Sequence, residues 1–255
     1  MTGAVTPVPW SLAEALAKLQ GEDLADRYYA AWYLGTLRDP EAVPALLAAL
    51  QDESDRTALG GYPLRRNAAK ALGAIGDPRA VPGLIQALGC SDYYVREEAA
   101  YALAQIGDPG AVPGLLALFA DPGGEQPWEA LIRALGVLQG REGVERIRPF
   151  LAHESERVRS AAASVLYRFT GDPELLEGLL AGLGHGNSSV RRAVVADVAE
   201  TGYVGAAPAI AAADVAVSLK LNALKRLFDV ASAGQSQSKV MEIAKEVMPW
   251  IEELL

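Results

Sequence analysis

The hydrophobic residues of this chain follow a pattern that repeats along its length. Small or apolar residues stand three, four and seven positions after a leading residue, as Ala68, Ala69 and Leu72 do after Arg65. This spacing matches the 3.6-residue period of an α-helix and not the alternation of a strand. The same stripe follows seven leading residues spaced roughly 31 positions apart, namely Arg27, Arg65, Arg96, Trp128, Arg159, Arg191 and Lys220. The pattern predicts seven similar helices.

A second block alternates with the first. GDPRAVPGLIQAL at 76–88 recurs as GDPGAVPGLLALF at 107–119, and more loosely at 38–50 and 171–183. Each block reads as a turn followed by a helix, because Asp-Pro opens it and a second proline falls where the first helical turn is expected. Two alternating helices in units of about 31 residues stack into a solenoid. The sequence therefore predicts an all-α fold, a right-handed α-solenoid of about seven HEAT-like helical pairs, forming a single domain over residues 1–255.

Local signals at both ends of the chain refine this prediction. Ser11 and Glu14 have the spacing of a capping box, which places the start of the first helix. The polar segment GQSQSK at 234–239 is expected to be a turn before a last helix. In that helix, Met248 and Trp250 either close the end of the solenoid or dock a partner helix, and the sequence leaves both open.

Composition excludes several classes of protein. Hydrophobic residues make up 51% of the 255 residues, yet no uninterrupted apolar run is long enough to span a membrane. The first ten residues, MTGAVTPVPW, lack the basic and apolar regions of a secretory signal. The formal charge of −9 argues against nucleic acid as a main partner. With Cys90 as the single cysteine, no internal disulfide can form, which fits a reducing, cytoplasmic location.

The second helix of each pair offers a row of surface positions. In HEAT-like repeats this helix lines the concave side, so positions +1, +2 and +5 from the leading residue are expected to face a groove. The +1 and +5 positions carry rings and cations in the first four repeats, among them Tyr28, Trp32, Arg66, Lys70, Tyr101 and Arg133. Tyr29 and Tyr33 have an alternative role, since the first pair of a solenoid often only covers its open end. Tyr33, at +6, is expected to pack.

Four segments carry a family resemblance. RYYAAWYLG at 27–35, DRTALGGYPLRRNAAKALGAIGD at 55–77, SDYYVREEAAYAL at 91–103 and SLKLNAL at 218–224 resemble the E-type subunits of the HEAT-like phycobilin lyase family. In the second of these segments, the loop before the helix runs about seven residues longer than its neighbours. The resemblance covers nearly the whole chain and weakens at 120–131, where a longer segment is expected.

The resemblance implies an enzyme that works as a heterodimer with an F-type subunit. Such lyases attach the open-chain tetrapyrrole phycocyanobilin through a thioether to a cysteine of the apo-phycocyanin α subunit. The thiolate adds across the ethylidene group of ring A, so phycocyanobilin is a substrate, and no metal or other cofactor is expected. The identity of the bilin and the chain that holds it are not specified.

The groove residues suit this chemistry. Aromatic side chains can contact the flat rings of a bilin, and arginine or lysine can bind its propionates. Tyr28, Trp32, Arg66, Lys70, Tyr101 and Arg133 are therefore predicted to bind the bilin. Holding bilin and thiol in one geometry would be the main contribution to catalysis. Glu97, Glu98 or Tyr101 could donate a proton, and the sequence gives no ground for choosing a catalytic residue among them.

Other reactive residues have ordinary structural explanations. Cys90 could carry bilin transiently, but its position suggests a small loop residue. His153 and His185 occupy the same loop slot one repeat apart, too far from each other to share a metal. The arginines that lead the second helices could bind carboxylates. We expect four of them to make structural hydrogen bonds along the stack instead, namely Arg65, Arg96, Arg159 and Arg191.

Two other functions remain open. One is a non-catalytic HEAT-like scaffold, including a bilin-protein chaperone or a phycobilisome-degradation factor. The other is an isomerising lyase, since the enzymes of the phycoerythrocyanin α subunit share this repeat. A scaffold has no need of a groove that combines rings with cations, and this feature favours a bilin lyase.

Overall fold

A computed structural model describes residues 10–120 and 125–255. The N-terminal residues considered for a secretory signal lie mostly outside these ranges, as does part of the segment at 120–131 where the resemblance weakens. The described residues form α-helices and short 3-10 helices, without any strand. The all-α prediction is confirmed.

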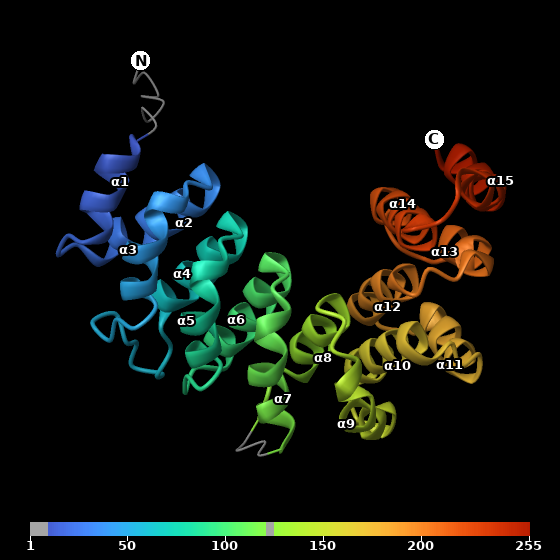
Figure 1. Cartoon of the computed structure of the whole chain (residues 1–255), viewed down its shortest axis with the longest axis horizontal. Helices are drawn as coiled ribbons and strands as arrows, with labels where there is room; N and C mark the ends of the chain where they lie inside the picture. Colours follow the sequence, from blue (N-terminus) through green and yellow to red (C-terminus); the bar gives the residue numbers. More distant parts are fainter. Residues whose placement is uncertain (1–9, 121–124) are drawn as a thin grey trace. The chain divides into compact units, whose positions relative to one another are not determined.

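The chain divides into two compact units, Met1–Gln139 and Gly140–Leu255. Helices of two alternating kinds stack within each unit, which makes both HEAT-like solenoid arrays (Figure 1). A single solenoid domain over the whole chain remains a prediction.

Over residues 10–120 and 125–139, the first unit contains four helical pairs. Its α-helices are α1 (Leu12–Leu19), α2 (Leu24–Leu37), α3 (Val43–Ala49), α4 (Pro63–Ile75), α5 (Val81–Ala87), α6 (Tyr93–Ile106), α7 (Val112–Ala120) and α8 (Trp128–Val137). A 3-10 turn precedes α3, α5 and α7 at Pro40–Ala42, Pro78–Ala80 and Pro109–Ala111. Asp77 caps one of these turns, because its side chain accepts a hydrogen bond from the backbone N–H of Arg79 at 2.9 Å. The predicted capping box of Ser11 and Glu14 is present at the start of α1.

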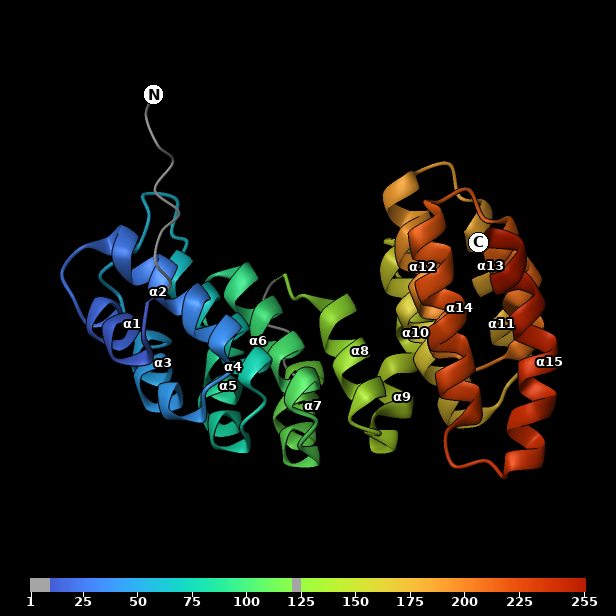
Figure 2. The ribbon, with the colours of Figure 1, turned by 90° about the horizontal axis from the view of Figure 1, so that it is seen from above.

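Helices α2, α4, α6 and α8 form one row and pack in succession (Figures 1 and 2). The predicted core positions are buried in every helix of this row, as Ala30, Ala31 and Leu34 illustrate in α2. Burial of these side chains removes apolar surface from water, which stabilises the fold by about 25 cal/mol per Å² of buried surface. The periodicity of the sequence thus gives the inward face of each second helix correctly.

Two glycines allow the row to pack closely. A Cβ atom at Gly35 of α2 would lie 2.9 Å from the Cα atom of Ala71 in α4. One repeat later, a Cβ atom at Gly73 would lie 2.7 Å from the Cα atom of Ala102 in α6. Real Cβ atoms do not approach backbone this closely, so neighbouring helix axes can be this near only because glycine stands at these positions.

The predicted long loop of the first unit joins α3 to α4 over residues 50–62, where residues 88–92 join α5 to α6. Its last residue, Tyr62, is buried and donates its backbone N–H to Asp92 Oδ2 at 2.8 Å. Asp92 also caps α6, since its Oδ1 atom accepts from the backbone N–H of Tyr94 at 2.9 Å. A residue at the start of α6 therefore anchors the loop before α4.

The second unit continues the alternation. Its α-helices are α9 (Val144–Ile147), α10 (Glu156–Thr170), α11 (Glu174–Ala181), α12 (Ser188–Glu200), α13 (Ala207–Ala212), α14 (Val217–Ser232) and α15 (Gln237–Leu254). Short 3-10 segments lie at Arg141–Gly143, Arg148–Ala152, Gly182–Gly184 and Val204–Ala206. Helices α10, α12 and α14 form the row of second helices, with Val194, Val195 and Val198 among its buried residues.

The last helix closes the core of the second unit. Ile243 and Val247 of α15 are buried, and Trp250 packs against the same cluster. Met248 stays exposed, so it does not take part in this closure. The turn predicted at 234–239 is shorter than expected, because Ser236 accepts from the backbone N–H of Lys239 and α15 begins at Gln237.

The leading arginines hold the loops before their helices. Arg191 is typical, since its Nη1 atom donates to the carbonyl oxygens of His185 and Gly186 at 2.8 and 3.1 Å. Three equivalent side chains also donate to backbone carbonyls, namely Arg65, Arg96 and Arg159. The predicted structural role of these four arginines is confirmed.

Candidate functional site

A cavity of about 470 Å³ lies between α2 and α4 in the first unit. Its walls combine an aromatic ring, two cations, polar groups and small residues, from Trp32, Gly35, Thr36, Arg38, Asn67, Lys70, Ala71 and Ala74. This volume falls in the range of small-molecule sites, which combine apolar surface with a few placed polar groups.

Small residues leave the space open. Gly35 and Ala71 are the pair that brings α2 and α4 close together, and Ala74 follows one helical turn after Lys70. Trp32 stands beside them with 53% of its surface exposed. An indole that exposed is available to stack on a flat ligand, and its role is not explained by burial in the core.

Two cations give the cavity a positive charge. Lys70 projects from α4, and Arg38 stands at the C-terminal end of α2. Both side chains are exposed, and neither makes a side-chain hydrogen bond or an ion pair with residues 10–120 or 125–255. Lys70 interacts electrostatically with Glu98 of α6 but makes no direct ion pair, so both cations can bind an anionic group of a ligand without first breaking one.

The other aromatic residues of α2 lie on two different faces. Tyr28 and Tyr29 are exposed and meet edge to face, with ring centroids 5.5 Å apart. The Tyr28 carbonyl oxygen accepts from Asn67 Nδ2 at 3.1 Å, which ties α2 to α4 beside the cavity. Tyr33 packs against Trp10 and donates its hydroxyl to the Trp10 carbonyl oxygen at 2.8 Å. The prediction that Tyr33 packs is confirmed. Tyr29 is exposed, which does not fit the alternative that its ring is buried over the core at the open end of the solenoid.

Arg66 points toward the start of α6. Its guanidinium lies 4.3 Å from the centroid of the Tyr94 ring, and its Nη2 atom is 3.6 Å from Asp92 Oδ2. The Nε atom of Arg66 is buried without a hydrogen-bond partner among the described residues. Arg66 therefore has a carboxylate and a ring of its own, and it is not among the residues that line the cavity between α2 and α4.

Glu98 of α6 is a partly buried acid that interacts with two cations of α4, Lys70 and Arg66. Burial raises the pKa of its carboxyl group above the ordinary value, and Lys70 and Arg66 oppose part of this shift. Desolvation disfavours the charged carboxylate more than the two cations favour it. Glu98 does not line the cavity, but it interacts electrostatically with Lys70, which does.

The two remaining predicted residues lie farther along the row. Tyr101 is partly buried in α6. In α8, Arg133 Nη1 lies 2.6 Å from Glu129 Oε1, an ion pair one helical turn apart. Of the six predicted bilin-binding residues, the structure brings Trp32 and Lys70 together in one cavity and places the others outside its lining.

The sequence reasoning missed Arg38 and Thr36, which both line the cavity. A signal for Arg38 was present, because RDP at 38–40 stands where the repeats at 76–78 and 107–109 have GDP. An arginine in place of a turn glycine marks a position that differs from the repeat.

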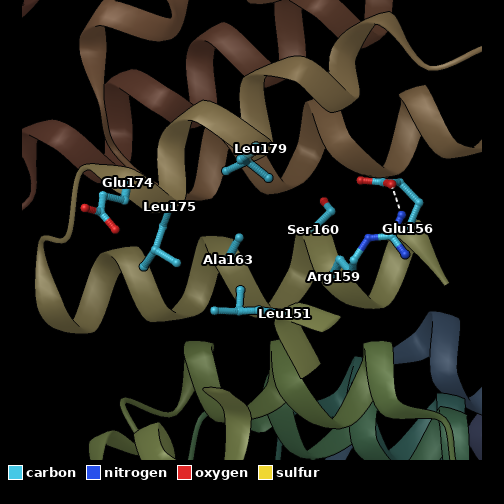
Figure 3. Close-up of a pocket in the computed structure, with 9 residues that line it drawn as sticks. Leu151, Glu156, Arg159, Ser160, Ala163, Glu174, Leu175 and Leu179 are labelled. Atoms are coloured by element: carbon cyan, nitrogen blue, oxygen red, sulfur yellow. Dashed lines mark hydrogen bonds and ion pairs between the residues drawn. The ribbon is translucent and has the colours of Figure 1, made fainter. Parts of the chain in front are cut away.

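A second cavity, of about 310 Å³, lies between α10 and α11 of the other unit (Figure 3). Leu151, Leu175 and Leu179 give it an apolar wall. Its arginine, Arg159, forms an ion pair with Glu156 at the cavity rim. With its arginine already paired and without an aromatic ring in its lining, this cavity fits a flat anionic ligand less well.

The histidines have structural roles, and Cys90 lies close to a buried arginine. His153 Nδ1 accepts from the backbone N–H of Ser155, and His185 Nδ1 accepts from that of Asn187, both at 3.0 Å. Cys90 is partly buried, with its Sγ atom 3.8 Å from Arg65 Nη1, a neighbour that the sequence did not indicate. In the part of the chain that the structure describes, no three His, Cys, Asp or Glu side chains are grouped to hold a metal ion.

Comparisons with known proteins agree with the repeat architecture. The chain matches the family described as HEAT repeats over residues 62–126 and 128–200, and the PBS lyase HEAT-like repeat over residues 26–52. Within the described ranges, every helix is too short or too polar to span a bilayer.

Two curated relatives and one solved structure cover most of the chain. It is 45% identical to phycocyanobilin lyase subunit alpha of Synechocystis sp., over 96% of this chain and 97% of that protein. It is 47% identical to the bilin biosynthesis protein PecE of Mastigocladus laminosus, over 90% of this chain and 86% of that protein. A solved chain from the complex of CpcE and CpcF of phycocyanin lyase, from Nostoc sp. PCC7120, is 42% identical with a TM-score of 0.85, covering 99% of this chain and 97% of that one.

Proposed function

Since this chain belongs to the family of phycocyanobilin lyase alpha subunits, we propose that it attaches phycocyanobilin to a cysteine of the phycocyanin α subunit. The observation that carries this proposal is the 45% identity with phycocyanobilin lyase subunit alpha over nearly the full length of both proteins. The solved complex of CpcE and CpcF supports a heterodimer with an F-type subunit as the working form. The apo-phycocyanin α subunit is the acceptor.

The reaction adds a thiol across a double bond. The acceptor sulfur bonds to the exocyclic carbon of the ring A ethylidene group, and a proton goes to the ring carbon. No group leaves and no electron is gained or lost overall, so the reaction needs neither a metal nor a redox cofactor. What the lyase contributes is the position of the two reactants, which can lower the barrier by several kcal/mol.

The cavity between α2 and α4 is where this chain contacts the bilin. Trp32 stacks on one of the conjugated rings, and Lys70 binds a propionate. Tyr28 extends the aromatic surface along α2, while Tyr101, Arg66 and Arg133 belong to the following helices and contact the bilin or its acceptor farther along the row. The exposure of Trp32 and of Lys70, both of which line the cavity, supports this assignment.

Glu98 is the candidate proton donor among the three acids that the sequence left open. A carboxyl group with a raised pKa keeps its proton closer to neutral pH, as a general acid requires. Its electrostatic interaction with Lys70, a residue that lines the cavity, supports this assignment. Glu98 would protonate the bilin as the thiolate adds.

Reconstitution in a heterologous host tests the proposed function. This chain is co-expressed with an F-type subunit, the enzymes of phycocyanobilin synthesis and the apo-phycocyanin α subunit. The expected result is zinc-induced fluorescence of the α subunit on a denaturing gel, lost when this chain or the acceptor cysteine is removed. An α subunit without covalent pigment, when all components are present and soluble, contradicts the proposal and favours a non-catalytic scaffold.

The 47% identity with PecE keeps a second function, that of an isomerising lyase, as a candidate. Isomerisation shortens the conjugated system of the attached bilin, so the product absorbs at shorter wavelength than attached phycocyanobilin. The absorption spectrum of the denatured product distinguishes the two activities in the same reconstitution.

A further inference from the structure

The C-terminal end of α2 has an unusual residue in a left-handed conformation. Arg38 caps this helix with φ of 54° and ψ of 32°. The equivalent caps of α4 and α6 are Gly76 and Gly107, with φ of 77° and 75°. Glycine adopts this conformation without a steric penalty, whereas a residue with a Cβ atom is disfavoured there. The helix end alone therefore favours glycine at position 38.

Gln139 offers an internal comparison. Among the described residues it is the other non-glycine residue with positive φ, at 58°. Its side-chain Nε2 atom reaches the carbonyl oxygen of Gly136 at 3.5 Å, so it contacts its own helix end. The Arg38 side chain makes no such bond within the described ranges and instead lines the cavity between α2 and α4. A contact with its own helix end thus explains why a residue other than glycine stands at position 139, whereas no such contact explains the arginine at position 38.

The cavity supplies the reason for an arginine. Trp32 offers a ring face and Lys70 one cation, and Arg38 adds a second cation from the other helix. A guanidinium can bind a carboxylate through two parallel hydrogen bonds, which fixes the orientation of the ligand as well as its position. A flat molecule with two carboxylates can then be held at both cations while its rings lie against Trp32.

We infer that Arg38 binds a propionate carboxylate of the bilin and, together with Lys70, selects ligands with free acid groups. This inference rests on the proposed function, because it assigns a residue to the same cavity. Arg38 is a binding and positioning residue, and no proton transfer is attributed to it.

The experiment compares two ligands and three variants in the purified complex with the F-type subunit. Binding of phycocyanobilin and of its dimethyl ester, which lacks the carboxylate charges, is measured by absorption titration. For Arg38→Gly, affinity for the free acid is expected to fall about tenfold or more, as for a lost charge-assisted hydrogen bond. Affinity for the ester should change little. Arg38→Lys should keep part of the preference for the free acid.

Gln139→Gly is the matched control. Both substitutions place glycine where the backbone is left-handed, which removes the steric penalty of a Cβ atom there, so neither should lower the melting temperature. Only Arg38→Gly should weaken binding of the free acid. A purely structural role of Arg38 predicts that the two variants behave alike in both measurements.

Three failures can be told apart. If the wild-type complex binds phycocyanobilin and Arg38→Gly binds it equally well, the role of Arg38 is wrong while the proposed function stands. If the wild-type complex, active in reconstitution, binds both ligands with the same affinity, selection for carboxylates is wrong. If the wild-type complex neither binds bilin nor transfers it, the proposed function and this inference both fail.

Discussion

At the residue scale, the site depends on side chains that the helical core does not need. Trp32, Arg38 and Lys70 are exposed while their helices pack through small and apolar residues on another face. Arg66 and Arg133 illustrate the opposite case, since each has a carboxylate nearby within the first unit. Arg38 and Lys70 can therefore bind a ligand without breaking a direct ion pair, whereas Arg66 and Arg133 would first have to exchange the carboxylates beside them.

The first prediction concerns Trp32. Trp32→Ala should lower the rate of bilin transfer about fivefold, as stacking of about 1 kcal/mol is lost. The free energy of unfolding should change by less than about 1 kcal/mol, because the side chain is more than half exposed. Thermal unfolding and bilin transfer are measured on the same preparation.

Trp250→Ala serves as its control. This side chain packs against the core of the second unit, so its removal should lower the melting temperature. An early-melting Trp32→Ala variant that transfers bilin normally in the cold would leave Trp32 with a structural role and contradict its place in the site.

The second prediction concerns Glu98. Burial raises its pKa in the folded state, so the native protein holds this proton at pH values where the unfolded chain has lost it. The contribution of Glu98 to stability therefore falls as the pH rises through the folded-state pKa. Glu98→Gln should raise the free energy of unfolding at pH 7 and leave it nearly unchanged at a pH well below 4.5, the ordinary value of the carboxyl group, where the acid is protonated in both states. Denaturant titrations at the two pH values measure this difference.

Bilin transfer by the same variant tests the role of Glu98 as an acid. Glu98→Gln should transfer bilin slowly at neutral pH and lose the decline in rate that deprotonation of Glu98 causes in the wild type. Glu97→Gln is the neighbouring control. Equal rates and equal pH profiles for wild type and Glu98→Gln would exclude Glu98 as the proton donor.

At the scale of the helix, the close approach of neighbouring second helices is the feature that most constrains the sequence. Gly73→Ala adds a Cβ atom 2.7 Å from the Cα atom of Ala102, so α4 and α6 have to move apart. Such overpacking costs about 1–3 kcal/mol, which outweighs the gain of about 1 kcal/mol in helix propensity. We expect a net loss of stability of about 1 kcal/mol, measured by urea unfolding.

Gly178→Ala is the matched control for this prediction. Gly178 lies inside α11, and no atom lies within 4 Å of its added Cβ position. This variant should gain up to about 1 kcal/mol from helix propensity alone. If both variants are stabilised, the close contact between α4 and α6 does not limit the packing.

The same elements explain how much the sequence could predict. The core stripe depends on a local period of 3.6 residues, so every second helix was placed correctly from Arg27 to Lys220. The site was predicted only in part, because a cavity depends on contacts between repeats. Asp92 is the clearest example, since it meets Arg66 from the loop of the following repeat. The pairing of Arg133 with Glu129 was accessible, being four residues apart in one helix.

At the scale of the whole molecule, the ends of a repeat array are where a second chain can add to it. A helical repeat buries its apolar face only against a neighbour, so a terminal helix keeps one side without a following repeat. In α15 this side includes Met241 and Met248, which are 58% and 41% exposed. These side chains are candidates for contact with a partner chain, alongside the rings exposed on α2.

The last prediction is a stable complex with an F-type subunit. Size-exclusion chromatography with light scattering should give a mass equal to the sum of this 26.9 kDa chain and its partner when the two are co-expressed. The melting temperature of this chain should rise with the concentration of the partner, because a ligand that binds only the folded state stabilises it by mass action. The chain without its partner, at the same concentration, is the control. Separate elution of the two chains at micromolar concentration, with unchanged melting temperatures, would contradict the heterodimer and require this chain to act on the bilin alone.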